Sequence, residues 1–206
     1  VAAGASETRR DRVELAGLGF HWPNASLTHG LENTLGYNPL RLGAYSRATG
    51  AEDHVGLPEQ RKFSALMPSY RSRLADLLGL RFVASSVPME KLDKAAEPAL
   101  KLVAATSDGF IYENTSALPR VMFATGAEVA DFEQLIRTGR WPELDPTKTV
   151  LLERLPGGER NRAPGRVRIL DYRNTRVTIE ADSPEGGWVV LNDIWHPWWR
   201  ATVDGH

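Results

Sequence analysis

Apolar and polar positions alternate along many short segments of this chain, and such a period of two residues predicts β-strands. Between residues 12 and 18, for example, Val13 and Leu15 are apolar while Arg12 and Glu14 are charged. Other segments of strand length with β-branched and aromatic residues are expected to form the remaining strands. They cover residues 80–85, 100–105, 109–113, 120–124, 149–154, 166–172, 176–181, 188–193 and 199–203.

Apolar residues at helical spacing occur mainly before residue 140. They predict a helix over 69–78 that ends at Gly79, and a second helix over 128–137 with Gly139 beyond its last turn. Shorter helical segments are expected at 39–45 and 59–67. Helices are therefore concentrated in the first part of the chain.

After residue 140 the pattern predicts strands only. This order of elements favours an α+β protein. We expect a mixed N-terminal part with short helices over 1–140 and an antiparallel, β-sandwich-like unit over 141–206, either as two domains or as one continuous domain.

Composition narrows the possible functions. Of the 206 residues 42% are hydrophobic, which is enough to build a core, and 25 basic against 26 acidic residues give a net charge of −1. A chain without net positive charge has no field that attracts nucleic acid, so no nucleic-acid partner is expected. The absence of cysteine excludes disulfides, thiolate zinc sites and a cysteine nucleophile.

Neither a cofactor nor a metal is expected. The five histidines, at positions 21, 29, 54, 196 and 206, lack the short spacing of metal ligands, and no phosphate-binding glycine loop or nucleophile elbow is present. No apolar run approaches the ~18 residues of a membrane-spanning helix. The first residues lack the pattern of an export signal, so any such signal is expected outside this sequence.

Tryptophans form the most distinctive cluster of the chain. Four of the six lie between residues 188 and 199. A tryptophan ring either fills a core or offers a flat face on which a sugar ring or lipid headgroup can stack, and the sequence leaves both roles open. Neighbouring polar side chains would then orient the sugar hydroxyls. The candidate ligand-binding residues here are Trp195, Trp198, Trp199, Asp193 and Arg200.

A glycine-bounded segment near residue 32 is a second candidate. Glu32, Asn33 and Tyr37 lie in what is expected to be a loop, and loops often carry binding groups. The alternative is a structural turn with Tyr37 packed inward.

Acidic residues in the C-terminal strands suggest a third possibility. A pair of carboxylates can catalyse glycosidic chemistry when they lie ~5–10 Å apart. The candidates are Asp171, Asp182, Asp193 and Asp204, and the alternative is that they are solvated residues at strand edges.

Several segments, in this order and spacing, resemble a known family. They are Gly36–Leu40, Leu77–Val83, Tyr112–Asn114, Ala117–Phe123, Val150–Glu153, Val167–Ala181 and Trp195–Gly205. Together they resemble the YfhO family of bacterial membrane proteins, which are multi-spanning proteins related to lipid-sugar-using glycosyltransferases and end in a large extracytoplasmic domain. Pro197 is followed by Trp198 where the family pattern has glycine, and the end at Asp204-Gly205 predicts a piece of a longer protein.

The resemblance implies a location and partners but no catalytic residues. The chain would lie on the extracytoplasmic side of the bacterial cytoplasmic membrane, periplasmic or at the cell surface. Its partners would be the transmembrane region that this sequence lacks and a glycan or polyprenyl-phosphate sugar. We therefore expect a non-catalytic domain that assists glycan or acceptor binding in envelope glycosylation.

Two other function classes stay open. The first is glycosyl transfer or hydrolysis by the paired carboxylates, either in this chain or in a parent glycosyltransferase. The second is a structural or protein-interaction module, for which we expect buried tryptophans and no concave pocket.

Overall fold

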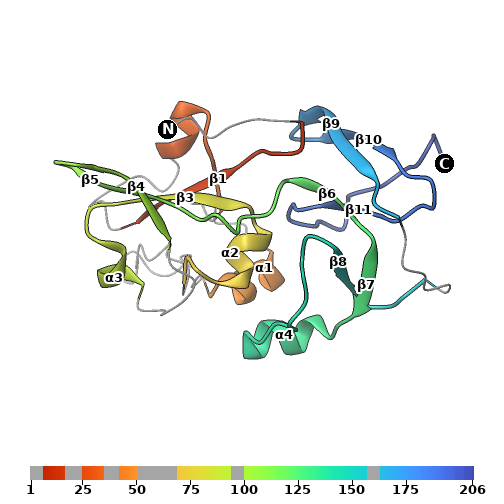
Figure 1. Cartoon of the computed structure of the whole chain (residues 1–206), viewed down its shortest axis with the longest axis horizontal. Coiled ribbons are helices and arrows are strands. Elements are labelled where there is room, and N and C mark those ends of the chain that lie inside the picture. The colour runs from red at the N-terminus through yellow and green to blue at the C-terminus, as the bar shows by residue number, and fades with distance from the viewer. Residues whose placement is uncertain (1–6, 17–24, 35–41, 51–68, 94–99, 157–162) are drawn as a thin grey trace.

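The computed structural model of the chain describes residues 7–16, 25–34, 42–50, 69–93, 100–156 and 163–206 (Figure 1). The candidate Tyr37 and the helix expected over 59–67 lie outside these ranges. The expected α+β class with antiparallel strand pairs is confirmed by short helices and several small sheets.

A mixed five-stranded sheet organises the first part of the chain. Its strand order is β2-β1-β3-β5-β4, with β1 parallel to both of its neighbours and β3, β5 and β4 antiparallel. The strands are β1 (Arg12–Ala16), β2 (Glu32–Asn33), β3 (Leu80–Ser85), β4 (Lys101–Thr106) and β5 (Gly109–Glu113). The helices of this part are η1 (Ala25–His29), α1 (Gly43–Thr49), α2 (Arg73–Leu77) and α3 (Met89–Leu92).

Three strand pairs make up the second part of the molecule. Strand β11 (Trp188–Leu191) pairs antiparallel with β6 (Val121–Ala124), and β9 (Arg166–Arg173) forms a hairpin with β10 (Arg176–Asp182). Strand β7 (Gly126–Val129) runs parallel to β8 (Thr149–Leu152), and the connection between them contains α4 (Phe132–Thr138). A parallel pair needs such a crossover. Strands on the two sides of residue 140 therefore pair with each other, and the second part is not antiparallel throughout.

Two predicted elements in this part need correction: a helix that forms and ends at Gly139 as expected but starts later, and a strand that is absent. The helix expected over 128–137 begins only at Phe132, because Glu128 and Val129 pair with β8 as part of β7. The Asp131 side chain caps this helix by accepting a hydrogen bond from the Gln134 N–H at 3.0 Å.

The strand expected over 199–203 does not form. The N–H of Trp199 donates to the His196 carbonyl at 2.9 Å, and Val203 and His206 exchange two backbone hydrogen bonds at 2.9 and 3.0 Å. Both ends of the segment are therefore held in local turns instead of pairing with another strand.

Two adjoining hydrophobic clusters form the core. The first packs α2 and α3 against the five-stranded sheet and contains the buried Leu80, Val83 and Met89. The second lies around Leu118 and Met122, and Leu77 of α2 packs against it. Helix α2 therefore contributes to both clusters and joins the two parts of the molecule (Figure 1).

The N-terminal segment also joins the two parts. The Thr8 carbonyl accepts a hydrogen bond from the Val121 N–H at 3.1 Å, and the Glu7 carbonyl accepts one from the Ile169 N–H at 2.6 Å. Residues 7 and 8 therefore lie against β6 and β9 before the chain enters β1 of the first sheet.

Candidate ligand-binding surface and the polar network below it

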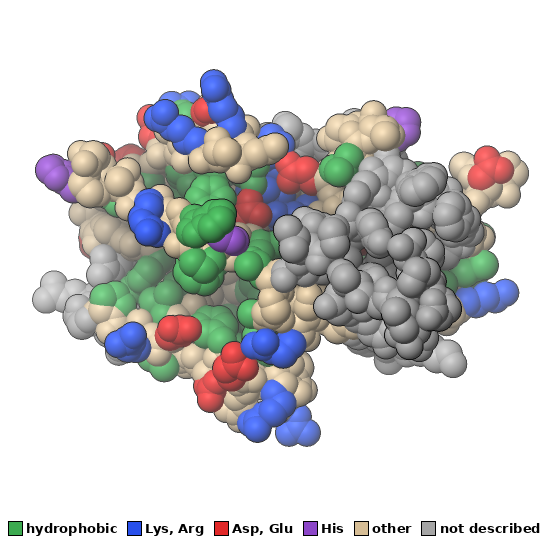
Figure 2. Space-filling view, turned by 180° about the vertical axis from the view of Figure 1, so that it is seen from behind, with side chains coloured by type: hydrophobic (Ala, Val, Ile, Leu, Met, Phe, Trp, Pro, Cys, Tyr) green, Lys and Arg blue, Asp and Glu red, His purple; other side chains and the backbone are tan. Residues whose placement is uncertain are grey.

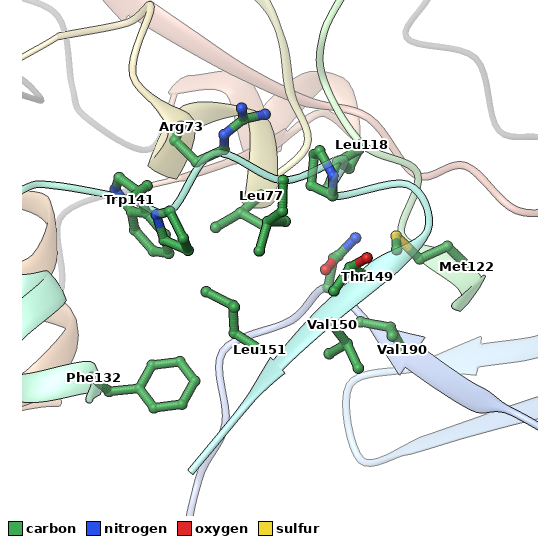
Figure 3. A pocket seen from close by; sticks show the side chains of 14 residues that line it. Arg73, Leu77, Leu118, Met122, Phe132, Trp141, Thr149, Val150, Leu151 and Val190 are labelled. Carbon is green, nitrogen blue, oxygen red and sulfur yellow. The ribbon is translucent and has the colours of Figure 1, made fainter. Parts of the chain in front are cut away.

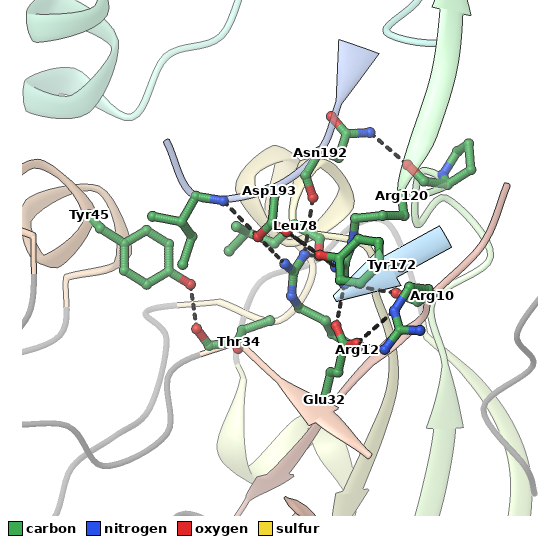
Figure 4. Close-up of polar contacts among 12 residues, drawn as sticks. Arg10, Arg12, Glu32, Thr34, Tyr45, Leu78, Arg120, Tyr172, Asn192 and Asp193 are labelled. Atoms are coloured by element: carbon green, nitrogen blue, oxygen red, sulfur yellow. Dashed lines mark hydrogen bonds and ion pairs between the residues drawn. The ribbon is translucent and has the colours of Figure 1, made fainter. Parts of the chain in front are cut away.

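A buried polar network lies where the N-terminal sheet meets the C-terminal strands (Figure 4). At its centre are two arginines, Arg12 of β1 and Arg120 just before β6, which are 5% and 2% exposed. Strand register places Arg12 opposite Glu32 of β2. The network therefore connects segments that are far apart in the sequence.

Arg12 binds the end of β11. One of its terminal nitrogens donates to the Leu78 carbonyl at 2.6 Å and to the Asn192 carbonyl at 3.3 Å. The other donates to Oδ1 of Asp193 at 2.8 Å. Asp193 is the residue from which the tryptophan-rich segment starts.

Arg120 contacts two acidic side chains at once. Its Nη2 donates to Oε2 of Glu32 at 2.7 Å and to the Arg10 carbonyl at 2.9 Å, while its Nη1 lies 3.4 Å from Oδ2 of Asp193. The Tyr172 hydroxyl of β9 accepts from Arg120 and donates to Asp193. Two predicted site residues, Glu32 and Asp193, are thereby brought together on one guanidinium.

The network determines how its carboxyl groups titrate. Burial alone would raise the pKa of Asp193, but Arg12, the Tyr172 hydroxyl and Arg120 hold that pKa below its ordinary value. For Glu32, burial is likewise outweighed by Arg120 and Arg10, so its pKa is also lowered. Both carboxylates are therefore ionised at neutral pH.

Tyr172 keeps its proton. Burial and the hydrogen bond to Asp193 raise the pKa of Tyr172 to about 12. A glycosidase pair needs one carboxyl group that retains a proton near neutral pH. Because the pKa of both Glu32 and Asp193 is lowered, this pair lacks the required acid and acts as an ionic clamp.

Glu32 and Asn33 differ from the sequence-based expectation in one respect. They form strand β2 and not a loop, because both pair with β1, where Asn33 lies opposite Val13. The polar side chain of Glu32 is turned to the buried arginines. This part of the predicted pocket is a sheet edge tied to the network.

The segment after Asp193 is very different. Trp195 and Trp198 are 70% and 84% exposed, whereas Trp199 is half-buried. The His196 ring stands edge-on to the Trp198 ring, with the centroids 4.7 Å apart. Arg200 donates to the carbonyls of Pro197 and Trp199 at 2.9 and 3.0 Å. Local contacts therefore hold a turn that presents two indole rings to solvent.

Asp193 connects this turn to the network. Its Oδ1 accepts from the Ile194 N–H at 2.8 Å and also binds Arg12. Asp193 is thus the anchor of the turn, and its oxygens are engaged by protein groups. Figure 2 shows hydrophobic side chains gathered on the outer face over the part of the molecule that contains β6 to β11, with charged side chains along the margin.

The other acidic candidates lie apart from the network. Asp171 pairs with Arg173 on the same strand at 3.0 Å, and Asp182 and Asp204 are exposed. Within the described ranges, no group of three or more His, Asp or Glu side chains is placed to hold a metal ion. In the same ranges, none of the helices has the length and apolar character of a membrane span.

Sequence reasoning missed the basic and phenolic members of the network. Arg12, Arg120 and Tyr172 each lie in or next to a predicted strand, where a polar residue is normally assigned to the solvent side. Only the pairing of β1 with β2 and the approach of β9 bring them together.

No family model, curated protein or solved structure matches the chain. The resemblance to the YfhO family therefore stays a prediction.

Proposed function

We propose that this chain is a non-catalytic, glycan-binding extracytoplasmic domain of a polytopic bacterial membrane protein related to lipid-sugar-dependent glycosyltransferases. The single observation that carries the glycan-binding part is the exposure of Trp195 and Trp198 on a turn anchored by Asp193. The location and the membrane partner rest on the resemblance of the segments quoted above.

Two exposed tryptophans on one short turn are well suited to sugars. A large apolar ring in water carries an unfavourable hydration free energy, and covering it with a flat ligand face removes that cost. A sugar ring has such a face, formed by its C–H groups, and its hydroxyl groups take hydrogen bonds from polar neighbours. Arg200, which lies exposed on the same turn, is the neighbour that would donate them.

The ionic clamp supports this function indirectly. Ordering a mobile loop on binding costs conformational free energy, which weakens affinity. Because Asp193 is bound to Arg12 and lies within reach of Arg120, the root of the tryptophan turn is already fixed before a ligand arrives. The predicted partners are an acceptor glycan or a polyprenyl-phosphate sugar, together with the membrane region of the parent protein.

The catalytic alternative has weaker support. Of its candidates Asp171, Asp182, Asp193 and Asp204, Asp193 lies in the polar network, where its lowered pKa leaves it without a proton to donate. For a structural or protein-interaction module we expected buried tryptophans. Trp195 and Trp198 are exposed, so this alternative also has weaker support.

Binding of the 206-residue chain to a panel of envelope glycans and polyprenyl-phosphate sugars tests the proposal. We expect saturable binding by calorimetry to at least one glycan. Trp198→Ala and Trp195→Ala should each weaken binding at least about fivefold, since an aromatic contact is worth about 1 kcal/mol beyond the buried area.

A matched control separates stacking from general hydrophobic loss. Leu170 of β9 is 53% exposed and lies outside the turn, so Leu170→Ala should bind as well as the unmodified chain. Binding that survives in the Trp195→Ala/Trp198→Ala double variant would contradict the assignment of the site, and no binding across the panel would favour a protein-docking role.

A further inference from the structure

A cavity of about 160 Å³ lies between α2, β6, α4, β8 and β11 (Figure 3). Leu77 of α2, Leu118 and Met122 form part of its wall, and Val150, Leu151 and Val190 come from the strands. Phe132 of α4 and Trp141 cover one side with aromatic rings. The cavity thus lies in the second hydrophobic cluster and not at the tryptophan turn.

The lining is almost entirely apolar. Asn192 contributes to it, but its Nδ2 is already used in a hydrogen bond to the Pro119 carbonyl at 2.7 Å. A bound water molecule needs two to four polar partners, which this mostly apolar wall offers poorly, whereas an apolar volume of ~150 Å³ accepts a molecule such as benzene. By the same measure this cavity accommodates about six carbon atoms.

Arg73 is the charged residue among those that line the cavity. Its side chain is 36% exposed, and its ion pair with Asp76 is 3.8 Å long, which is beyond hydrogen-bond distance. In Figure 3 its guanidinium points away from the apolar interior while its stem borders it. A cation at the rim of an apolar cavity matches an amphiphile with an anionic head.

We propose that this cavity binds the hydrocarbon end of a small amphiphile whose anionic head lies beside Arg73. The head is a carboxylate or a phosphate, since a partly exposed guanidinium pairs with either. The hydrocarbon end of the amphiphile is aliphatic, as are most of the side chains in the cavity wall. This site is independent of the glycan surface, because Trp195, Trp198 and Arg200 do not line it.

Titrating the 206-residue chain with straight-chain carboxylates from butanoate to decanoate tests the proposal. Affinity should rise roughly fourfold for each added methylene group as long as the added part of the alkyl chain enters the cavity. It should level off once about six carbons are buried, because the remainder stays in water. Affinity that is absent throughout, or that rises without a plateau, would overturn the proposal.

Variants of the cavity wall test where the alkyl chain of the carboxylate binds. Leu151→Trp fills the cavity and should abolish binding of octanoate, with the melting temperature showing that the variant is folded. If it is not folded, Phe132→Ala provides the second test, because a larger cavity should move the plateau to a longer carboxylate. Octanoate binding that is unchanged in the folded Leu151→Trp variant, or an unmoved plateau in Phe132→Ala, would contradict the site.

The head is tested separately. Arg73→Gln should weaken octanoate several-fold and leave 1-octanol unchanged, since only the former carries a charge. Comparing heptanoate with hexyl phosphate then identifies which head is preferred. Equal loss of octanoate and 1-octanol would contradict the role of Arg73, and Leu170→Ala, outside both the cavity and the tryptophan turn, serves as the control that should bind octanoate normally.

Discussion

The polar network and the tryptophan turn are neighbours in sequence but opposite in environment. Asp193 is held by Arg12 and Tyr172 and lies beside Arg120, whereas Trp195, only a short step further along the chain, is 70% exposed. The usual assignment of residue types is reversed here, with charge inside and aromatic rings outside. The comparison indicates that the charged residues provide position and the aromatic residues provide the contact surface.

The different costs of burying a charge and of exposing an aromatic ring explain why the charged residues are inside and the tryptophans outside. A buried charge is tolerated only when it is paired and hydrogen-bonded, and each carboxylate of the network meets that condition. An exposed tryptophan has no such requirement, but its unfavourable hydration is relieved when a ligand covers it. The network should therefore matter for stability and the turn for binding.

Removing Arg120 should give the largest effect. Arg120→Met leaves Glu32 and Asp193 without their shared cation in a mostly buried site, and breaking a buried pair costs about 3–5 kcal/mol. Urea unfolding of the purified chain measures this loss. Arg168→Met is the matched control, because its partner Glu180 is exposed and little change is expected. Equal stability of the two variants would mean that the network does not hold the halves together.

The second largest effect on stability should come from replacing Trp188, whereas replacing Trp198, on the other side of Asp193 in the sequence, should have little effect. Trp188 in β11 packs against the second hydrophobic cluster, so Trp188→Ala should lower the free energy of unfolding by about 2 kcal/mol. Trp198 is 84% exposed, and Trp198→Ala should change the free energy of unfolding by less than ~0.5 kcal/mol. A comparably large loss in Trp198→Ala would show that the turn is part of the core and would remove the basis for a sugar platform.

The smallest expected effect is in the pH dependence of stability. The pKa of Asp193 is lower in the folded chain than its ordinary value of 3.8, so its ionised form stabilises the fold. This contribution is present above the unfolded pKa and is lost as the pH falls through the folded one. Unfolding free energies measured from pH 7 to pH 2 should therefore fall in acid, by at most about 1.4 kcal/mol per pH unit for each proton taken up.

Asp193→Asn separates this contribution from others. The variant should show a shallower acid decline than the unmodified chain. Asp76, whose pKa is raised by burial, contributes with the opposite sign in both proteins and cancels in the comparison. Identical acid profiles for the two proteins would show that the network does not lower the pKa of Asp193.

Local pattern was sufficient for many elements. Strand β3 covers the expected residues 80–85, and β4 and β5 form close to the segments expected over 100–105 and 109–113. These elements depend on residues close in sequence, whose side-chain period and turn chemistry already specify them. The wrong predictions have a different cause: Glu128 and Val129 carry a helical pattern, but pairing with β8 gives them strand geometry.

The sequence by itself determined the α+β class, most strands, the absence of cysteine chemistry and the concentration of tryptophans near residue 195. Only the tertiary structure decided that Glu32 and Asp193 share one arginine, that Trp195 and Trp198 face solvent, and that an apolar cavity opens beside α2. The reason is that hydrophobic periodicity records which residues prefer burial, whereas partners of a buried charge come from segments distant in the chain. Those partners are set by strand register and packing, which local sequence does not encode.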